Sequence, residues 1–256
     1  MDFQEKIKQK KGKRKIIMLT AYDFQMASIL DQSDIDLILV GDSSGMVIQG
    51  YSDTKSVTMA EMIYHIKAVK RGAKSMPIIG DMPINSCNTV QDCLRNAMQF
   101  IEAGAHGIKI EGRKTESIET LIDKEIPVMG HVGMLPQMAE SYHVKGKKPE
   151  EAKQILQDAE ELDKLGVFSI VLECIPESLA KTITESVDVP TIGIGAGKYC
   201  DGQVLVINDM LGYNEDFKPK YVKSYANLNK TIKDAVAEFM EEVNAGTYPD
   251  KEHTYH

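Results

Sequence analysis

Three carboxylates stand where short apolar runs of the sequence end: Asp42, Asp81 and Glu111. An aliphatic run such as residues 37–40 is typical of a strand buried on both faces, as in a parallel sheet. If the runs form neighbouring parallel strands, the three acids converge, and they repel one another unless a cation lies among them. Mg²⁺ prefers oxygen ligands and keeps several waters, so two or three carboxylates suit it. The alternative is that each acid caps a helix or pairs with a lysine; three acids at equivalent positions favour Mg²⁺.

A lysine precedes the third of these acids by two residues. Lys109 therefore lies on the same side of its strand as Glu111, because side chains alternate along a strand. If that side faces the inside of the fold, an ammonium group lies beside the metal, where it could bind a substrate carboxylate. A buried ion pair with one of the acids is the alternative, and both could hold together.

Two further apolar runs end in Glu173 and His131. Glu173 stands between Leu172 and Cys174, so we expect it to be desolvated and its pKa to be raised, as suits a general base near neutral pH. Its alternative role is a structural acid bonded to a loop amide. We expect Glu173 across the barrel from the metal group. His131 is the other candidate base, but we interpret it as a substrate ligand or orienter, although a structural, hydrogen-bonded histidine is the commoner case.

The elements that position these residues alternate between strand and helix along the chain. This alternation predicts a closed (β/α)8 barrel with its catalytic face at the carboxyl ends of the strands. Only a short segment separates the seventh and eighth strands, and its Gly193–Gly197 stretch could be a phosphate loop or a tight turn. We expect one domain over residues 1–256, with a short helix within residues 2–13 lying outside the core. The strands are expected at residues 16–20, 37–40, 77–80, 107–111, 127–131, 169–173, 191–194 and 204–207.

Composition excludes several classes of protein. The chain is 43% apolar and 27% charged, with a net charge of −8, which argues against a nucleic-acid or anionic-membrane partner. No apolar run approaches the roughly 20 residues that span a bilayer, and the first residues lack an apolar signal core. The four cysteines have no zinc spacing and no CxxC motif, so we expect reduced thiols and a cytoplasmic protein.

Motifs that run almost end to end resemble one known family, the 3-methyl-2-oxobutanoate (ketopantoate) hydroxymethyltransferases. Their order and spacing together, more than any single motif, carry the resemblance. Those motifs include Leu19-Thr20-Ala21-Tyr22-Asp23, Val40-Gly41-Asp42-Ser43, Ile108-Lys109-Ile110-Glu111-Gly112, Gly130-His131-Val132-Gly133, Val171-Leu172-Glu173-Cys174-Ile175-Pro176 and Ile192-Gly193-Ile194-Gly195-Ala196-Gly197.

The resemblance implies a barrel of the isocitrate lyase/phosphoenolpyruvate mutase type. It also implies transfer of a hydroxymethyl group from 5,10-methylenetetrahydrofolate to 3-methyl-2-oxobutanoate, giving 2-dehydropantoate on the route to pantothenate and coenzyme A. The family assembles many identical barrels, usually ten, so the resemblance implies a homo-oligomer.

Residue roles follow from the matching motifs. The resemblance places Mg²⁺ on Asp42 and Asp81, with Glu111 in or next to its shell, and makes Glu173 the proton acceptor. Ser43 and Lys109 correspond to the family's ligands for the ketoacid carboxylate. The substrate-binding set is then Asp42, Ser43, Asp81, Lys109 and His131.

Two segments depart from the family pattern. The segment Met134–Lys145, which we expect to close over the site, is slightly short and lacks the family's glycines. Pro83-Ile84-Asn85 lacks an aromatic residue that is common after the proline. Two other functions stay open: a Mg²⁺-dependent carbon–carbon lyase or mutase acting on another 2-oxo acid, and a non-catalytic scaffold. The lyases and mutases often carry a Lys-Cys-Gly loop, which this sequence lacks, and the acids at every expected position count against a scaffold.

Overall fold

A computed structural model describes residues 2–139, 141, 143–214 and 219–255 of the chain. The chain forms two compact units, residues 1–206 and residues 207–256, and all strands of the barrel belong to the first. The expectation of a single domain over residues 1–256 stays a prediction.

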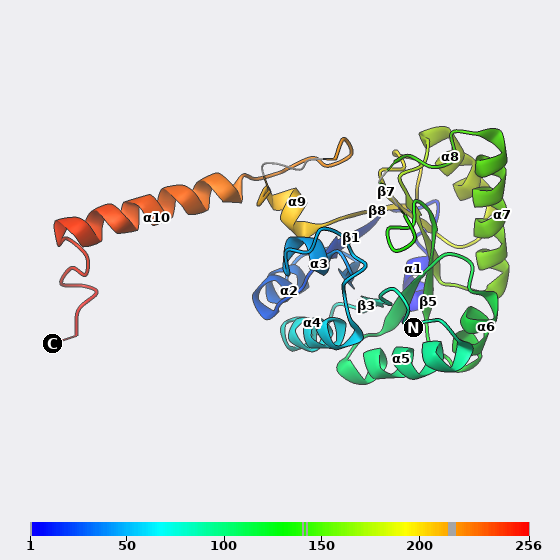
Figure 1. Ribbon diagram of the computed structural model, residues 1–256, viewed down its shortest axis with the longest axis horizontal. Coiled ribbons are helices and arrows are strands. Elements are labelled where there is room, and N and C mark those ends of the chain that lie inside the picture. The colour runs from blue at the N-terminus through cyan, green and yellow to red at the C-terminus, as the bar shows by residue number, and fades with distance from the viewer. Residues whose placement is uncertain (1, 140, 142, 215–218, 256) are drawn as a thin grey trace. The chain divides into compact units, whose positions relative to one another are not determined.

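Eight parallel strands form a closed barrel in sequential order, which confirms the predicted fold (Figure 1). The last strand begins and ends two residues earlier than expected, at Gly202 and Leu205. Gly202 pairs with Ile16, and a side chain there would stand 2.6 Å from the Ile16 carbonyl oxygen, so the strand needs a glycine that an apolar run does not reveal. The strands are β1 (Ile16–Thr20), β2 (Leu37–Val40), β3 (Ile78–Asp81), β4 (Gly107–Glu111), β5 (Val128–Gly133), β6 (Ser169–Glu173), β7 (Thr191–Ile194) and β8 (Gly202–Leu205).

Helices follow most strands and surround the barrel (Figure 1). Thr58 and Glu61 form the capping box that starts α4, and Gly104 and Gly166 end α5 and α7 in the left-handed conformation that glycine adopts without strain. These helices are α2 (Phe24–Asp31), α3 (Ser44–Val47), α4 (Met59–Gly72), α5 (Val90–Ala103), α6 (Thr115–Asp123), α7 (Pro149–Leu165) and α8 (Glu177–Ser186).

A tight, glycine-rich connection joins β7 to β8. Gly195 and Gly197 both have positive φ, and a Cβ on Gly197 would stand 2.5 Å from Cγ of Glu177 at the start of α8. Close packing against α8 therefore requires this glycine, which favours the tight turn over the phosphate loop. Asp201 at the end of the connection accepts a hydrogen bond from the backbone N–H of Thr191 and pairs with Lys11.

The first helix, α1 (Phe3–Lys8), packs against the barrel, so the expectation that it lies outside the core is wrong. Ile7 is buried within the main apolar cluster, and the ring of Phe3 contacts Phe168 edge-on at 5.4 Å between centroids. Ile16 and Leu37, which begin β1 and β2, belong to the same cluster. The lysine-rich composition of the segment concealed these two apolar contacts.

The second unit contains α9 (Ile207–Leu211) and α10 (Leu228–Ala245). Ile207, which was expected to end the eighth strand, begins α9 instead. The side chain of Asn227 caps α10 by accepting a hydrogen bond from the Lys230 N–H. No residue of α10 is buried.

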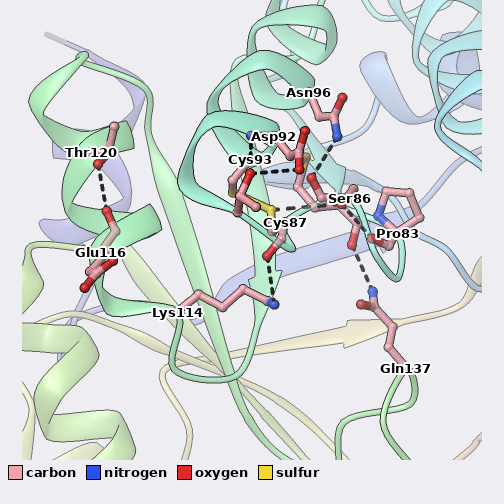
Figure 2. The surroundings of a disulfide bond; sticks show 12 residues. Pro83, Ser86, Cys87, Asp92, Cys93, Asn96, Lys114, Glu116, Thr120 and Gln137 are labelled. Atoms are coloured by element: carbon pink, nitrogen blue, oxygen red, sulfur yellow. Dashed lines mark hydrogen bonds between the residues drawn. A yellow bond between two sulfur atoms is a disulfide. The ribbon is translucent and has the colours of Figure 1, made fainter.

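Two of the four cysteines are paired, which corrects the expectation of four reduced thiols. A disulfide joins Cys87, in the connection after β3, to Cys93 in the first turn of α5 (Figure 2). The start of α5 folds back on that connection and brings the two Cα atoms to 4.1 Å, a proximity that the sequence spacing does not indicate. Cys174 and Cys200 are free thiols. Within the described residues, no helix is both long enough and apolar enough to span a membrane.

Candidate active site

The register of the barrel strands brings the predicted carboxylates together at one end of the barrel. Asp81 is the register partner of Lys109 across β3 and β4, and Glu111 is the partner of His131 across β4 and β5. Asp42 follows β2, and its backbone N–H donates to a carboxylate oxygen of Asp81 at 3.4 Å. All five side chains are at least nine-tenths buried.

Lys109 pairs with the carboxylate of Asp81. Its Nζ lies 2.7 and 2.8 Å from the two oxygens of Asp81 and 3.8 Å from Oε1 of Glu111. Burial alone would lower the pKa of Lys109, but the charges of Asp81, Glu111 and Asp42 outweigh burial and raise it. The ammonium is therefore charged, and the buried ion pair that the sequence left open is present.

This part of the barrel holds more buried acids than cations. Burial, and then the charge of Asp81, raises the pKa of Asp42 well above its usual range, and burial raises the pKa of Glu111 to about 8. Oε1 of Glu111 is buried and has no hydrogen-bond partner. One ammonium group cannot balance three carboxylates when all three are ionised. A hard divalent cation would supply the missing positive charge. Residues and charge therefore fit Mg²⁺.

The carboxylates are not already arranged around an ion. Within the described ranges, no group of three His, Cys, Asp or Glu side chains has the spacing of a metal site. Lys109 holds both oxygens of Asp81, so a cation bound to Asp81 requires the ammonium to give up one of them.

Glu173 ends β6, which stands opposite β2 in the closed barrel, and one imidazole lies between its carboxylate and that of Glu111. His131 Nε2 lies 3.3 Å from Oε2 of Glu173, and His131 Nδ1 lies 3.6 Å from Oε1 of Glu111. Burial, followed by the charge of Lys109, lowers the pKa of His131 well below its usual range, so the ring is neutral. Burial raises the pKa of Glu173 to about 8, while its side chain stays 13% exposed. Glu173 is thus a poorly solvated carboxyl that a small substrate could still reach.

Ser43 lies beside the acids on the connection after β2. Its hydroxyl makes a 2.9 Å hydrogen bond with the phenol of Tyr22, a buried residue that follows β1. Hydroxyls that follow two adjacent strands, β1 and β2, therefore meet at Ser43, the residue after Asp42 in the chain.

One polar residue of the site was not predicted from the sequence. Gln137, in the connection after β5, donates from Nε2 to Oδ2 of Asp42 and from its backbone N–H to Oε2 of Glu111. The sequence feature that could have identified Gln137 was its place in the segment Met134–Lys145, which was expected to close over the site. Residues 140 and 142 of that segment lie outside the described residues.

The sequence matches the family model of ketopantoate hydroxymethyltransferase over residues 2–251. The chain belongs to the ketopantoate hydroxymethyltransferase family. It is 52% identical to a 3-methyl-2-oxobutanoate hydroxymethyltransferase of Clostridium botulinum (strain 657 / Type Ba4), covering 94% of this chain and 90% of the relative. A protein of the same name from Caldicellulosiruptor saccharolyticus is 51% identical over 97% of this chain and 96% of its own length. As a ketopantoate hydroxymethyltransferase family member, the chain is a transferase enzyme.

Solved structures of more distant proteins share the fold of this chain. A phosphonopyruvate hydrolase in complex with oxalate and Mg²⁺ superposes with a TM-score of 0.65 at 13% identity, covering 99% of this chain and 93% of the hydrolase. A 2,3-dimethylmalate lyase, described as a member of the PEP mutase/isocitrate lyase superfamily, gives a TM-score of 0.60 at 14% identity, covering 99% and 92%. The chain therefore shares the barrel fold of these proteins, as the resemblance implied.

Proposed function

We propose that this enzyme transfers the one-carbon unit of 5,10-methylenetetrahydrofolate to C3 of 3-methyl-2-oxobutanoate, with water providing the hydroxyl oxygen of the 2-dehydropantoate formed. This reaction would place the enzyme on the route to pantothenate and coenzyme A. The observation that supports the proposal is the cluster of the buried Asp42, Asp81 and Glu111, with the partly exposed Glu173, at the carboxyl ends of the strands in a chain of this family.

Asp42 and Asp81 would hold Mg²⁺, with Glu111 in or next to its shell. The support is the excess of buried acids over buried cations and the oxygen of Glu111 that has no hydrogen-bond partner. When bound, Mg²⁺ would polarise the 2-oxo group and stabilise the negative charge that develops as the C3 proton leaves.

Lys109 and Ser43 would bind the carboxylate of the ketoacid. Lys109 is a charged ammonium on the inner side of the barrel, and Ser43 carries a hydroxyl oriented by Tyr22. A substrate carboxylate arriving with Mg²⁺ would give Lys109 a new anionic partner as it gives up an oxygen of Asp81.

Glu173 would take the proton from C3. Its raised pKa makes it a stronger base than an exposed glutamate once it is ionised. His131, neutral and 3.3 Å away, would orient the carboxylate and contact the substrate. The C3 carbon, freed of its proton, would form the new C–C bond to the one-carbon unit. Both C–N bonds that hold this unit to the folate would break, water would supply the hydroxyl oxygen, and tetrahydrofolate would leave with one proton from water and one from C3.

The test is deuterium wash-in at C3 of 3-methyl-2-oxobutanoate with Mg²⁺ and without folate. We expect the parent to exchange and Glu173→Gln to exchange at least about 100-fold more slowly, because the amide keeps the shape but accepts no proton. Glu177→Gln, an exposed neighbour at the start of α8, is the matched control and should exchange like the parent.

Each result has a separate meaning. Parent-like exchange in Glu173→Gln would move the base elsewhere, with His131 next. If the parent shows neither exchange nor folate-dependent product, 3-methyl-2-oxobutanoate is excluded as the substrate. Exchange without folate-dependent product would point to a lyase or mutase on another 2-oxo acid.

We also propose that the enzyme is a cytoplasmic homo-oligomer, with ten copies as the family resemblance implies. The support for assembly is α10, whose apolar side chains Ile232, Val236, Phe239, Met240 and Val243 are all exposed in the chain by itself.

A further inference from the structure

Gln137 contacts the ends of three consecutive strands. Nε2 lies 2.9 Å from Oδ2 of Asp42, after β2, and 2.9 Å from the carbonyl oxygen of Met82, after β3. The backbone N–H donates to Oε2 of Glu111, which ends β4, at 3.2 Å. Gln137 is only 8% exposed, so these bonds lie largely out of solvent. The residue itself belongs to the connection after β5.

The chemistry of its partners allows only one orientation of the amide. A carboxylate oxygen of Asp42 and the carbonyl oxygen of Met82 are both acceptors, and the two N–H groups of the amide are donors. A flipped amide would direct its oxygen at two other oxygens. Both donors are therefore used, and the direction of the Asp42 carboxylate is fixed relative to β3.

The hydrogen bonds of Gln137 engage only one oxygen each of Asp42 and Glu111. Oδ2 of Asp42 and Oε2 of Glu111 each accept from Gln137, whereas Oε1 of Glu111 has no hydrogen-bond partner. One oxygen of each acid is thus held by this single residue.

We propose that Gln137 is a positioning residue for the divalent cation: it holds one oxygen of Asp42 and one of Glu111, and so directs their other oxygens toward the ion. The inference rests on the proposed function, because it requires Mg²⁺ at these carboxylates. Metal ligands in proteins are generally oriented by such outer hydrogen bonds, whose loss weakens metal binding or activity about 10- to 100-fold.

A second contact of the same connection provides a matched control. Lys55 is exposed, and its Nζ donates to the carbonyl oxygen of Ala139 at 2.6 Å, two residues beyond Gln137. Lys55→Met removes a tether of this connection without touching a carboxylate of the site. Comparing variants at the two positions distinguishes the effect of losing the Gln137 amide from the effect of loosening the whole connection after β5.

The experiment measures Mg²⁺ binding to the full chain by titration calorimetry, with no substrate present. Gln137→Met keeps the length of the side chain and the backbone N–H but removes both amide donors. We expect its Mg²⁺ dissociation constant to rise at least about 10-fold, while Lys55→Met stays within about twofold of the parent. Gln137→Leu carries the same expectation and replaces Gln137→Met if that variant does not fold.

The Mg²⁺ dependence of the rate is the second readout. Saturating Mg²⁺ should restore most of the kcat of Gln137→Met, because a positioning residue acts through occupancy of the ion. A loss that Mg²⁺ does not restore would contradict the inference.

The remaining outcomes keep this inference apart from the proposed function. A parent that does not bind Mg²⁺ overturns the proposed function itself. A parent that binds Mg²⁺, together with unchanged affinity in Gln137→Met, overturns only the role of Gln137. Equal losses in Gln137→Met and Lys55→Met would overturn it too, because they would assign the effect to the connection rather than the amide.

Discussion

Asp42 and Asp81 both belong to the buried acid cluster, but the structure gives them different electrostatic partners. Asp81 neutralises Lys109, whereas Asp42 is desolvated and repelled by Asp81. We predict that Asp42→Asn and Asp81→Asn each weaken Mg²⁺ binding strongly and nearly abolish turnover. Only Asp81→Asn should lower the free energy of unfolding of the metal-free protein markedly, by about 3 kcal/mol, because it leaves Lys109 buried without its anion.

Two measurements on both variants check these predictions. Calorimetric titration measures Mg²⁺ binding, and urea unfolding in the presence of a chelator measures the stability of the metal-free protein. Full activity of the parent after thorough chelation, or unaltered Mg²⁺ affinity in both variants, would exclude the metal role. Equal stability losses in the two variants would contradict the assignment of Asp81 as the partner of Lys109.

Glu173 should make C3 proton exchange depend on pH. Only its carboxylate accepts a proton, and burial raises its pKa to about 8, so the rate should rise with pH, about tenfold per unit below the midpoint. The positive charge of bound Mg²⁺ favours the carboxylate, so the midpoint should lie below 8 and above the usual value for glutamate, near 4.3. A pH–rate profile of wash-in at two Mg²⁺ concentrations measures the midpoint. A rate that falls as pH rises from 5 to 8 would rule out Glu173 as the base.

At the scale of elements, Asp31 at the end of α2 holds the connection between α4 and β3. Its carboxylate accepts from the backbone N–H groups of Lys74, Ser75 and Met76. Burial raises the pKa of Asp31, but these three donors outweigh burial and lower it. We predict that Asp31→Ala lowers the free energy of unfolding by about 2 kcal/mol at pH 7, since donors lose their acceptor.

The pH dependence of this contribution has a definite sign. The folded pKa lies below the unfolded value, so the stabilisation is complete above the unfolded pKa, near 4, and disappears as pH falls through the folded value. Urea unfolding at pH 7 and at pH 3 should therefore show a smaller difference between parent and variant at pH 3. Asp34→Ala, at a nearby exposed position, is the control and should match the parent.

The disulfide between Cys87 and Cys93 closes a short loop between β3 and α5. A loop of this size restricts the unfolded chain by about 2 kcal/mol in the chain-entropy account, so reductant should lower the free energy of unfolding by that amount. The double variant Cys87→Ala/Cys93→Ala should not respond to reductant. Thiol titration of the unreduced, denatured chain should count only Cys174 and Cys200. Four reactive thiols would show that the bond does not form in solution.

The sequence was most informative about where elements end. Apolar runs, caps and glycines located seven of the eight strands closely and placed the acids at the correct ends, because these features depend on neighbouring residues alone. It could not show which groups meet. The register between strands decides that Lys109 pairs with Asp81. It also decides that His131 lies between Glu111 and Glu173. Gln137 reaches Asp42 from 95 residues away, a distance that no local pattern spans.

For the molecule as a whole, the exposed apolar side chains of α10 support the proposed assembly. Ile232, Val236, Phe239 and Val243 follow helical spacing along one side, and each is close to half exposed or more. A soluble monomer rarely leaves such a continuous apolar stripe in water. We predict a homo-oligomer, measured by light scattering as a multiple of 28.5 kDa, with ten copies the expected number.

Charged substitutions test the stripe. Val236→Asp or Phe239→Asp should lower the measured mass, because a buried carboxylate at an interface is costly. Glu241→Gln, which leaves the apolar stripe intact, should keep the mass of the parent. A parent of 28.5 kDa would show that the chain does not assemble.

The pairing of β1 with β8 sets the order in which a growing chain can complete this barrel. Ile16 in β1 pairs with Gly202 in β8. The second neighbour of β1 is therefore synthesised only when the first unit is almost complete. Until then the nascent sheet has two open edges, β1 and whichever strand has emerged last, each with unpaired N–H and C=O groups that another chain could join. The first unit ends at residue 206, one residue after β8, so both edges disappear in one event once β8 has emerged, which precedes the emergence of α10. Protection from mispairing during synthesis is therefore needed mainly between the emergence of β1 and that of β8, and slow translation within this interval would prolong the exposure.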